Sequence, residues 1–204
     1  MEYDYSKGVI KLPNMELSIL DRLVLEFVSK IKVKYVIVSG YVAILFGRGR
    51  TTEDVDIFIE KLDKKRFEVF YNDIVKSEKF YCINAEDALE AYNLLAEENG
   101  SVRFAEKGTF DPNFEIKFPT NKKHHYSLDN ALTVDLGRGN SIRIGPLELQ
   151  LAYKLQLGSD KDYEDAAHLY MVFESDLDKK KLKGFITELG IKRGIVKKVL
   201  GIEV

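Results

Sequence analysis

The sequence predicts an α+β fold, in which a mixed β-sheet flanked by helices is followed by a C-terminal helical bundle. As far as residue 145, short runs of β-branched and aromatic residues alternate with helix-type patterns, which is typical of a sheet covered by helices. From Pro146 onward, the apolar residues recur at helical intervals only. We therefore expect an α/β domain over residues 1–145 and a helical domain over residues 146–204.

The composition limits the class of protein. The chain has 204 residues, which suffices for one domain and a small appended one. Its 31 basic and 33 acidic residues give a formal net charge of −2, so its overall charge attracts neither nucleic acid nor a membrane surface. No apolar run reaches transmembrane length and no signal-peptide pattern is present, so no membrane partner is expected. The single cysteine, Cys82, excludes an intramolecular disulfide and favours a cytoplasmic location.

The first sixty residues are expected to place a helix and two strands around a glycine turn. Apolar residues after Asn14 are spaced for one helix, for which Asn14 is a candidate N-cap. Ser39 and Gly40 interrupt the apolar run that follows, and Gly40 supplies a permissive backbone there. The expected elements are an extended arm at 1–13, the capped helix, a strand at 35–39, a short helix at 41–46, a polar loop at 47–52 and a strand at 54–59.

The later residues alternate between both kinds of element before the pattern becomes wholly helical. Up to residue 145 we expect a helix at 62–79, a short strand at 81–83, a helix at 85–98, strands at 101–110 and 114–118, a basic loop at 121–126 and a hairpin at 131–144. His124 and His125 fall in the basic loop and are interpreted as having no special role. Four helices follow, at 147–158, 162–173, 177–189 and 195–200.

Two carboxylates lie within the strand expected at 54–59. Residues two apart in a strand point to the same face, so Asp54 and Asp56 lie side by side, about 6–7 Å apart at the backbone. Apolar neighbours exclude water and strengthen the repulsion between the two charges. A shared proton, a basic partner or a divalent cation must offset this repulsion, and Mg²⁺ prefers such oxygen ligands. Ser39 and Gly40 lead into a helix N-terminus, where free backbone N–H groups can face a phosphate.

The glycine turn and the acidic strand belong to one longer motif, S-G-x2-A-x6-R-x-T-x-D-x-D, made of Ser39, Gly40, Ala43, Arg50, Thr52, Asp54 and Asp56. The motif resembles the signature of the polymerase-beta-type nucleotidyltransferase superfamily, and most nearly that of the AbiEii-like toxin nucleotidyltransferases and related uncharacterised prokaryotic proteins. The resemblance implies a nucleotidyltransferase-type sheet, in which Asp54 and Asp56 are catalytic and hold one or two Mg²⁺ ions. It also implies that the remaining polar residues of the motif bind the phosphates of a nucleoside triphosphate: Ser39, Gly40, Arg50 and Thr52.

Two alternatives attach to this motif. Arg48 and Arg50 could form a purely structural salt-bridge cluster with the two aspartates. Tyr41, which follows the glycine turn, is a candidate for narrowing the pocket or for stacking on a base.

The resemblance further implies a third carboxylate, on a neighbouring strand, that accepts the proton of the incoming hydroxyl. Glu115 is the first candidate, and the alternation within 114–118 places it on the same face as Lys117. The alternative for Glu115 is a surface ion pair with Lys117, which contributes little stability. Asp135 in the hairpin is the rival candidate, or it pairs with Arg143 across the hairpin.

A second motif follows in the helical part of the chain. Lys154, Lys161, Asp162 and Asp165 stand where AbiEii-like nucleotidyltransferases carry K-L…R-x-K-D-x-x-D. The resemblance implies that Lys154 and Lys161 neutralise the triphosphate. Asp162 is placed to cap the helix that begins there and to orient Lys161. The sequence departs from the family at Ser159, where an arginine is usual, so either one cation is missing or Arg48, Arg50 or Lys154 substitutes for it.

The sequence therefore favours an Mg²⁺-dependent nucleotidyltransferase, which moves a nucleoside monophosphate from a nucleoside triphosphate to an acceptor hydroxyl. The acceptor is an RNA such as tRNA, a protein or a small molecule. By analogy with the family, the protein is the toxin of a toxin–antitoxin pair, with an antitoxin protein as partner. The alternative is a catalytically inactive module on the same fold that binds nucleotide or protein, which is motivated by Ser159 and by the two candidates for the third carboxylate.

Overall fold

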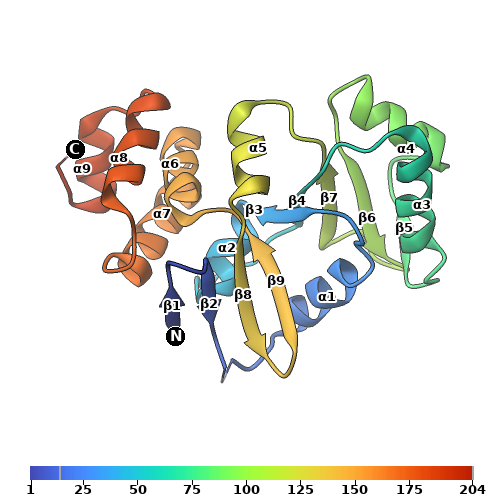
Figure 1. Cartoon of the computed structure of the whole chain (residues 1–204), viewed down its shortest axis with the longest axis horizontal. Coiled ribbons are helices and arrows are strands. Elements are labelled where there is room, and N and C mark those ends of the chain that lie inside the picture. The colour runs from blue at the N-terminus through green and yellow to red at the C-terminus, as the bar shows by residue number, and fades with distance from the viewer. Residues whose placement is uncertain (14, 204) are drawn as a thin grey trace.

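The computed structural model describes residues 1–13 and 15–203, and a mixed nine-stranded sheet runs through these residues (Figure 1). The strands lie in the order β1 (Glu2–Asp4), β2 (Val9–Lys11), β8 (Leu132–Gly137), β9 (Asn140–Ile144), β3 (Tyr35–Val38), β4 (Asp54–Ile59), β7 (Asn113–Lys117), β6 (Val102–Glu106) and β5 (Phe80–Cys82). β3 pairs with β4 in the antiparallel sense, whereas β4 pairs with β7 in the parallel sense. The predicted α+β class with a mixed sheet is confirmed.

The two faces of the central strands differ in how they are covered. Side chains alternate between the faces, so one face of β3, β4 and β7 belongs to the main hydrophobic core. On the other face, Val36 and Phe58 form a much smaller cluster with Leu128 of α5 (Lys122–Asp129). Asp54 and Asp56 precede Phe58 in steps of two and therefore lie on this second face, which we call the α5 face.

Four helices are set in the first half of the chain: α1 (Ile19–Val28), α2 (Gly40–Leu45), α3 (Lys64–Val75) and α4 (Ala88–Ala96). α1 packs on the sheet, with the ring of Phe27 stacked on Phe114 at a centroid distance of 3.8 Å. It begins after Ser18, whose hydroxyl accepts the N–H of Asp21, while the Asp21 carboxylate accepts the N–H of Ser18. Asn14, the predicted cap, lies outside the described residues.

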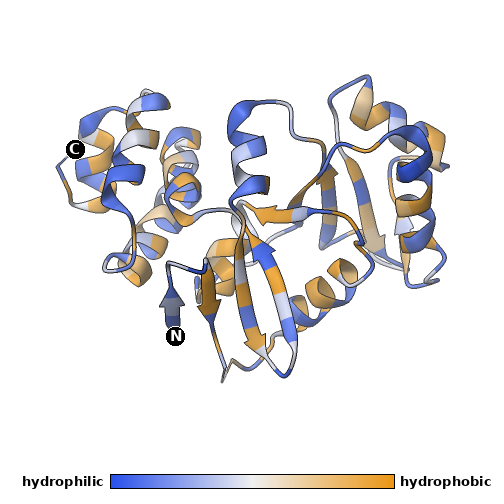
Figure 2. Ribbon diagram, viewed as in Figure 1, coloured by the Kyte–Doolittle hydropathy of each residue, from blue (hydrophilic) through white to orange (hydrophobic). Residues whose placement is uncertain are grey.

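Two segments differ from the sequence-based prediction. The arm at 1–13 contains two paired strands, and β2 adds to the sheet in parallel with β8. The segment at 121–126, expected to be a loop, enters helix α5, because the Asn121 side chain accepts the N–H groups of Lys123 and His124. The α5 ribbon is mostly hydrophilic (Figure 2), and its buried residues are Ser127 and Leu128. The helix escaped prediction because it has almost no apolar stripe.

The C-terminal part contains α6 (Leu147–Leu157), α7 (Asp160–Phe173), α8 (Lys179–Glu188) and α9 (Arg193–Leu200). These helices share the main hydrophobic core with the sheet, and Phe173 of α7 packs edge-on against Phe46 after α2 at 4.7 Å. The domain boundary at residue 146 stays a prediction. Within the described ranges, no helix has both the length and the apolar character needed to cross a membrane.

Candidate functional site

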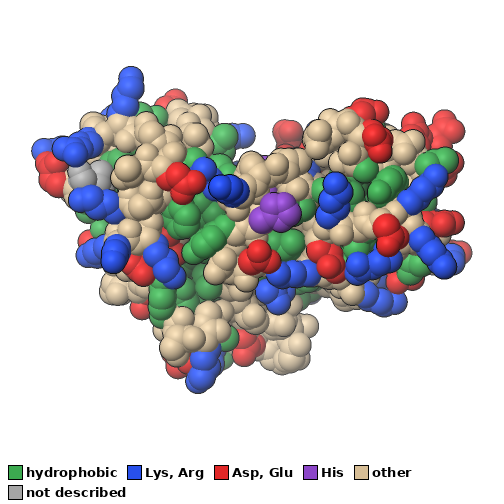
Figure 3. Space-filling model, turned by 45° about the horizontal axis from the view of Figure 1, so that its top comes forward, with side chains coloured by type: hydrophobic (Ala, Val, Ile, Leu, Met, Phe, Trp, Pro, Cys, Tyr) green, Lys and Arg blue, Asp and Glu red, His purple; other side chains and the backbone are tan. Residues whose placement is uncertain are grey.

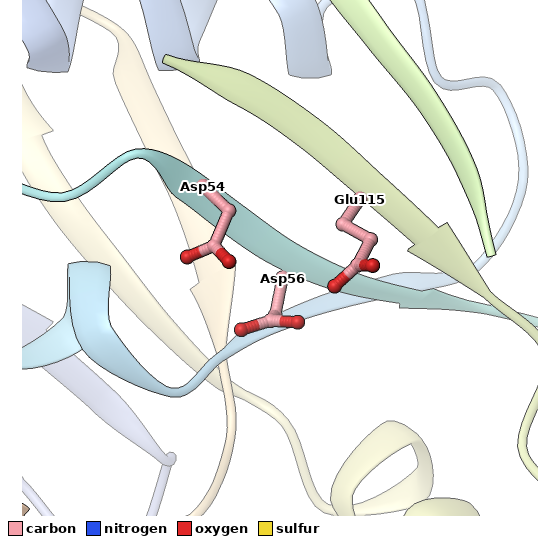
Figure 4. Close-up of side chains that lie close together, drawn as sticks. All are labelled: Asp54, Asp56 and Glu115. Carbon is pink, nitrogen blue, oxygen red and sulfur yellow. The ribbon is translucent and has the colours of Figure 1, made fainter. Parts of the chain in front are cut away.

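Three carboxylates from two neighbouring strands meet on the α5 face. Asp54 and Asp56 project from β4, and Glu115 of β7 lies opposite Asp56 in the parallel pairing. Figure 4 shows the three side chains on one side of the two strands, with their carboxylates close together. One oxygen of each lies within 4.8 Å of one oxygen of each of the others. The structure thus brings the acidic pair together with the first candidate for the third carboxylate, and we call these residues the carboxylate cluster.

A lysine ammonium joins two of these carboxylates. Nζ of Lys117 donates to Oδ1 of Asp56 at 2.9 Å and to Oε2 of Glu115 at 2.6 Å. The other oxygen of Glu115 accepts from Oγ of Ser101 at 2.7 Å and from Nη2 of Arg103 at 3.0 Å. The pair of Glu115 and Lys117 is therefore present, but inside the carboxylate cluster and largely buried: the Glu115 side chain is 10% exposed.

Burial and hydrogen bonding act in opposite directions on these groups. Burial raises the pKa of Asp56, and the charge of Lys117 only partly offsets this. Burial also acts to raise the pKa of Glu115, but hydrogen bonds from Lys117 and Ser101 outweigh it and lower the pKa to about 2. Burial acts to lower the pKa of Lys117, but the charge of Asp56 and the bond to Glu115 outweigh it and raise the pKa. Glu115 is therefore ionised, and it is a weak base as long as Lys117 and Ser101 hold it.

The donor set suits a hard divalent cation. All three side chains offer carboxylate oxygens, which Mg²⁺ prefers, and two oxygens bound to one Mg²⁺ are at most about 4.2 Å apart. The oxygens lie within 4.8 Å of one another, so they need to approach by no more than about 0.6 Å. A cation would also displace Lys117 from between Asp56 and Glu115. Asp54 is exposed and forms no ion pair within the described residues, so its oxygens are accessible.

The turn between β3 and α2 combines a strained residue with a close contact. Ser39 has φ 67° and ψ −135°, a backbone region that strongly favours glycine. Gly40 is needed for a different reason from the predicted one, because a Cβ there would lie 2.6 Å from Nη2 of Arg50. The N–H of Ser39 already donates to Oε1 of Gln150 at 3.1 Å. The hydroxyl of Ser39 can therefore bind a phosphate, whereas the N–H of Ser39 already donates to Gln150.

Two residues predicted to contact the triphosphate, Arg50 and Lys154, form a buried ion cluster beside the turn. Asp165, which is fully buried, accepts hydrogen bonds from Nε and Nη2 of Arg50 at 2.9 and 2.8 Å and lies 2.9 Å from Nζ of Lys154. Lys154 also donates to Asp162 at 2.8 Å. Burial acts to raise the pKa of both aspartates, but hydrogen bonds from Arg50 to Asp165 and from Lys154 to both aspartates lower it. We call Arg50, Lys154, Asp162 and Asp165 the Asp165 cluster.

The predicted roles of Asp162, to cap α7 and to orient Lys161, are wrong. Ser159 is the N-cap, since its Oγ accepts the N–H of Asp162 at 3.3 Å. Asp162 therefore does not cap the helix, and its carboxylate pairs with Lys154 rather than Lys161. Lys161 is exposed and forms no ion pair within the part of the chain that the structure describes.

The arginines of the loop at 47–52 do not neutralise the acidic pair. Arg50 faces Asp165, and Arg48 pairs with Glu164 and lies 3.8 Å from Asp165. The predicted alternative, a salt-bridge cluster of these arginines with the acidic pair of β4, is therefore wrong, and Lys117 provides the basic partner.

Two further candidates lie away from the carboxylate cluster. Asp135 accepts a backbone N–H of its own turn at 2.8 Å, and strands β9 and β3 separate its strand from β4. Thr133, not Asp135, lies opposite Arg143 in the hairpin. Tyr41 is fully buried and its hydroxyl donates to Asp21 at 2.8 Å, so its ring is not free to stack on a base.

A cavity of about 260 Å³ opens beside Asp56, between the α5 face of the sheet and helices α5 and α6. The surface is hollowed between the C-terminal helices and the part that carries α3 and α4, and histidine side chains lie in this region (Figure 3). Three of the residues that line this cavity were not predicted from the sequence as site residues: His124, Gln150 and Tyr153. Gln150 and Tyr153 are one helical turn apart, but this spacing alone does not distinguish a cavity wall from core packing.

The chain matches no protein-family model, and no curated protein matches it. It is similar in structure to an antigenic nucleotidyltransferase-like protein from Paracoccidioides brasiliensis, with a TM-score of 0.54 and 18% sequence identity. The similarity covers 95% of this chain and 95% of that one. At this identity the likeness shows the fold alone: the chain has a nucleotidyltransferase-like fold.

Proposed function

We propose that the protein is an Mg²⁺-dependent nucleotidyltransferase that moves a nucleoside monophosphate from a nucleoside triphosphate to an acceptor hydroxyl, with pyrophosphate as the leaving group. The observation that supports this most strongly is the carboxylate cluster, which sits beside the glycine turn of a nucleotidyltransferase-like fold. Carboxylate oxygens on adjacent strands are the ligands such a reaction needs, because its transition state is stabilised mainly by neutralising charge and aligning the reactants.

The residues of the carboxylate cluster are assigned distinct roles. Asp54 and Asp56 would hold the cation, and Mg²⁺ bound there would neutralise phosphate charge and align the attacking oxygen. Lys117, once released from Asp56, is free to bind a phosphate oxygen as an ammonium point charge. Glu115 then loses a partner that lowers its pKa and becomes able to accept the proton of the acceptor hydroxyl.

The predicted phosphate-binding residues other than Lys161 divide into two groups. The hydroxyls of Ser39 and Thr52 are assigned to direct contact, because Ser39 borders the cavity beside Asp56 and Oγ1 of Thr52 lies 3.4 Å from Oδ1 of Asp54. Gly40 provides the space in which Arg50 approaches the turn. Members of the Asp165 cluster act indirectly, by holding the turn, because their charges are already matched.

The test is transfer from each labelled nucleoside triphosphate, with Mg²⁺, to total RNA or total protein. Asp54→Asn and Asp56→Asn should each lower labelling by at least about 100-fold while the melting temperature stays near the wild-type value. Asp135→Asn is the matched control, because Asp135 lies outside the carboxylate cluster, and it should keep wild-type activity. Full activity of either cluster variant would refute the proposal.

An inactive nucleotide-binding module is a second candidate, favoured by one observation. Lys117 sits between Asp56 and Glu115, where it neutralises two of the three carboxylates without a metal ion. Calorimetry and the labelling assay together separate the two candidates. The inactive module binds a nucleoside triphosphate with Mg²⁺ in calorimetry but labels no acceptor. Turnover with any acceptor excludes it.

Among the acceptors we favour RNA, because positive charge is concentrated on the last two helices. Between residues 179 and 200 the chain has eight basic residues against the single acid Glu188, a formal charge of +7 in a chain that carries −2 overall. All eight are exposed, and Figure 3 shows lysine and arginine side chains at that end of the molecule. Exposed cations on neighbouring helices attract a phosphate backbone. Labelling of protein but not RNA would exclude this acceptor.

The place of the protein within the superfamily and the cell is proposed on the resemblance and the composition alone. An AbiEii-like toxin with an antitoxin would be harmful when expressed by itself and harmless with a co-purifying partner. A cytoplasmic location is expected from the single cysteine, Cys82, which is free.

A further inference from the structure

The cavity next to Asp56 is lined by both charged and apolar side chains. Ser39, Asp56 and Lys117 border it on the side of the carboxylate cluster. Away from them, the walls include the apolar side chains of Leu149 and Leu157, both on α6. A ligand that fills the cavity must therefore be charged at one end and largely apolar at the other.

The first feature that defines this ligand is an unpaired amide. Gln150 borders the cavity and is 6% exposed. Its Oε1 accepts the N–H of Ser39, which fixes the orientation of the amide, because an N–H group requires the oxygen and not the nitrogen opposite it. Its Nε2 has no hydrogen-bond partner within the described residues. A buried amide donor without an acceptor is costly, so a ligand that brings an acceptor gains affinity here.

The second feature is a group of aromatic rings on the same cavity. The His124 ring of α5 stacks on Phe58 of β4, with centroids 4.4 Å apart and planes inclined by 27°. Tyr153 of α6 lies 6.4 Å from His124. Burial and the nearby charge of Lys117 lower the pKa of His124, so its ring is uncharged at neutral pH. Uncharged rings of this kind bind planar aromatic ligands by stacking.

We propose that this cavity binds the base of the nucleoside triphosphate, and that Gln150 selects among bases by donating Nε2–H to an acceptor on the base edge. A nucleobase is planar and aromatic and carries acceptors on its edge, and its phosphates would extend past Lys117 toward the carboxylate cluster. The inference rests on the proposed function, since it names the part of the substrate that this site reads. The polar character of α5 follows, because one face of this helix borders a ligand site and not the core.

The test is equilibrium binding of the four nucleoside triphosphates and of inorganic tripolyphosphate, each with Mg²⁺, by calorimetry. The wild type should prefer one base by about tenfold or more. Gln150→Met keeps the length of the side chain but removes the Nε2 donor together with the Oε1 that accepts the Ser39 N–H, and it should reduce this preference to within about threefold. His124→Leu removes a ring, and it should weaken all four triphosphates by about tenfold, since stacking is tolerant of base identity.

Tripolyphosphate distinguishes a failure of this inference from a failure of the proposed function. It should bind both variants as tightly as the wild type, because it lacks a base. If the wild type binds tripolyphosphate and all four nucleotides equally, or if Gln150→Met keeps the wild-type preference, the base does not occupy the cavity and the inference is overturned. If the wild type binds neither nucleotides nor tripolyphosphate, the proposed function fails and the inference fails with it.

Discussion

Two groups of charged side chains flank the glycine turn, and they differ in how their charges are balanced. In the Asp165 cluster, two carboxylates meet two cations and no side chain is more than 19% exposed. In the carboxylate cluster, Lys117 and Arg103 pair with Asp56 and Glu115 only, and Asp54 and Arg103 are exposed.

This difference separates charges that hold the fold from charges that can bind. Buried charges that match one another stabilise only while every partner is present, because removal of one leaves another uncompensated. Carboxylates that outnumber their cations at an accessible surface gain from an added cation. The predicted phosphate-binding residues Arg50 and Lys154 lie in the first group, whereas the predicted metal-binding residues Asp54 and Asp56 lie in the second.

The largest expected effect is the loss of stability when Asp165 is replaced. Asp165→Asn keeps the shape of the side chain but leaves Arg50 and Lys154 with an unmatched buried charge, so unfolding free energy should fall by about 3–5 kcal/mol. Urea denaturation measures this loss. Glu164→Gln is the control, since Glu164 pairs with Arg48 at the surface and should contribute no more than about 1 kcal/mol. Equal effects of the two changes would show that the Asp165 cluster is not structural.

The contribution of the Asp165 cluster to stability should also depend on pH in the wild type. The pKa values of Asp162 and Asp165 are lowered in the folded state, so their ionised forms stabilise it above about pH 4. This stabilisation is lost as the pH falls through the lowered folded-state pKa values. Unfolding free energy measured from pH 6 downward should therefore fall more steeply in the wild type than in Asp165→Asn. Parallel curves would contradict the assignment.

Lys117 allows the carboxylate cluster to be tested in the opposite direction. Lys117→Met removes an ammonium that competes with a divalent cation, so the affinity for Mg²⁺ should rise about tenfold. Calorimetry measures the affinity, and the variant should also gain more thermal stability from Mg²⁺ than the wild type does. Lys161→Met, at an exposed lysine without an ion pair in the described residues, should change neither quantity. An unchanged affinity in Lys117→Met would mean that the cation does not compete with Lys117 for Asp56.

The turn that joins the two clusters should give the smallest effects. Ser39→Gly relieves a positive φ and should raise unfolding free energy by about 1 kcal/mol. Gly40→Ala should lower it, because the new Cβ would push Nη2 of Arg50 away from Asp165. Thermal unfolding of the two variants checks the signs, and a destabilising Ser39→Gly would mean that the turn is not strained.

Much of the sheet and the carboxylate cluster could be predicted because they depend on local order. Strand β4 has the predicted bounds, and its period of two puts Asp54 and Asp56 on one face whatever the rest of the chain does. The same alternation placed Glu115 and Lys117 together on β7. The third carboxylate was expected on a neighbouring strand. In the structure β7 is that strand, and its pairing with β4 places Glu115 opposite Asp56.

The features that escaped prediction depend on contacts between distant segments. Arg50 and Asp165 are 115 residues apart, and nothing in the spacing of either motif shows that one neutralises the other. Helix α5 has no apolar stripe, so its side chains could not be assigned to a cavity wall. The unpaired amide of Gln150 is recognisable only once Ser39 is seen to occupy its other end.

The most direct test of the account is the binding of Mn²⁺, a paramagnetic cation that accepts the same carboxylate ligands as Mg²⁺, followed by electron paramagnetic resonance. The wild type and Asp165→Asn, the latter at a temperature where it is folded, should both bind Mn²⁺, whereas Asp54→Asn and Asp56→Asn should not. Binding that survives in both cluster variants, or that is lost only in Asp165→Asn, would contradict the assignment of the metal site to Asp54 and Asp56 of β4.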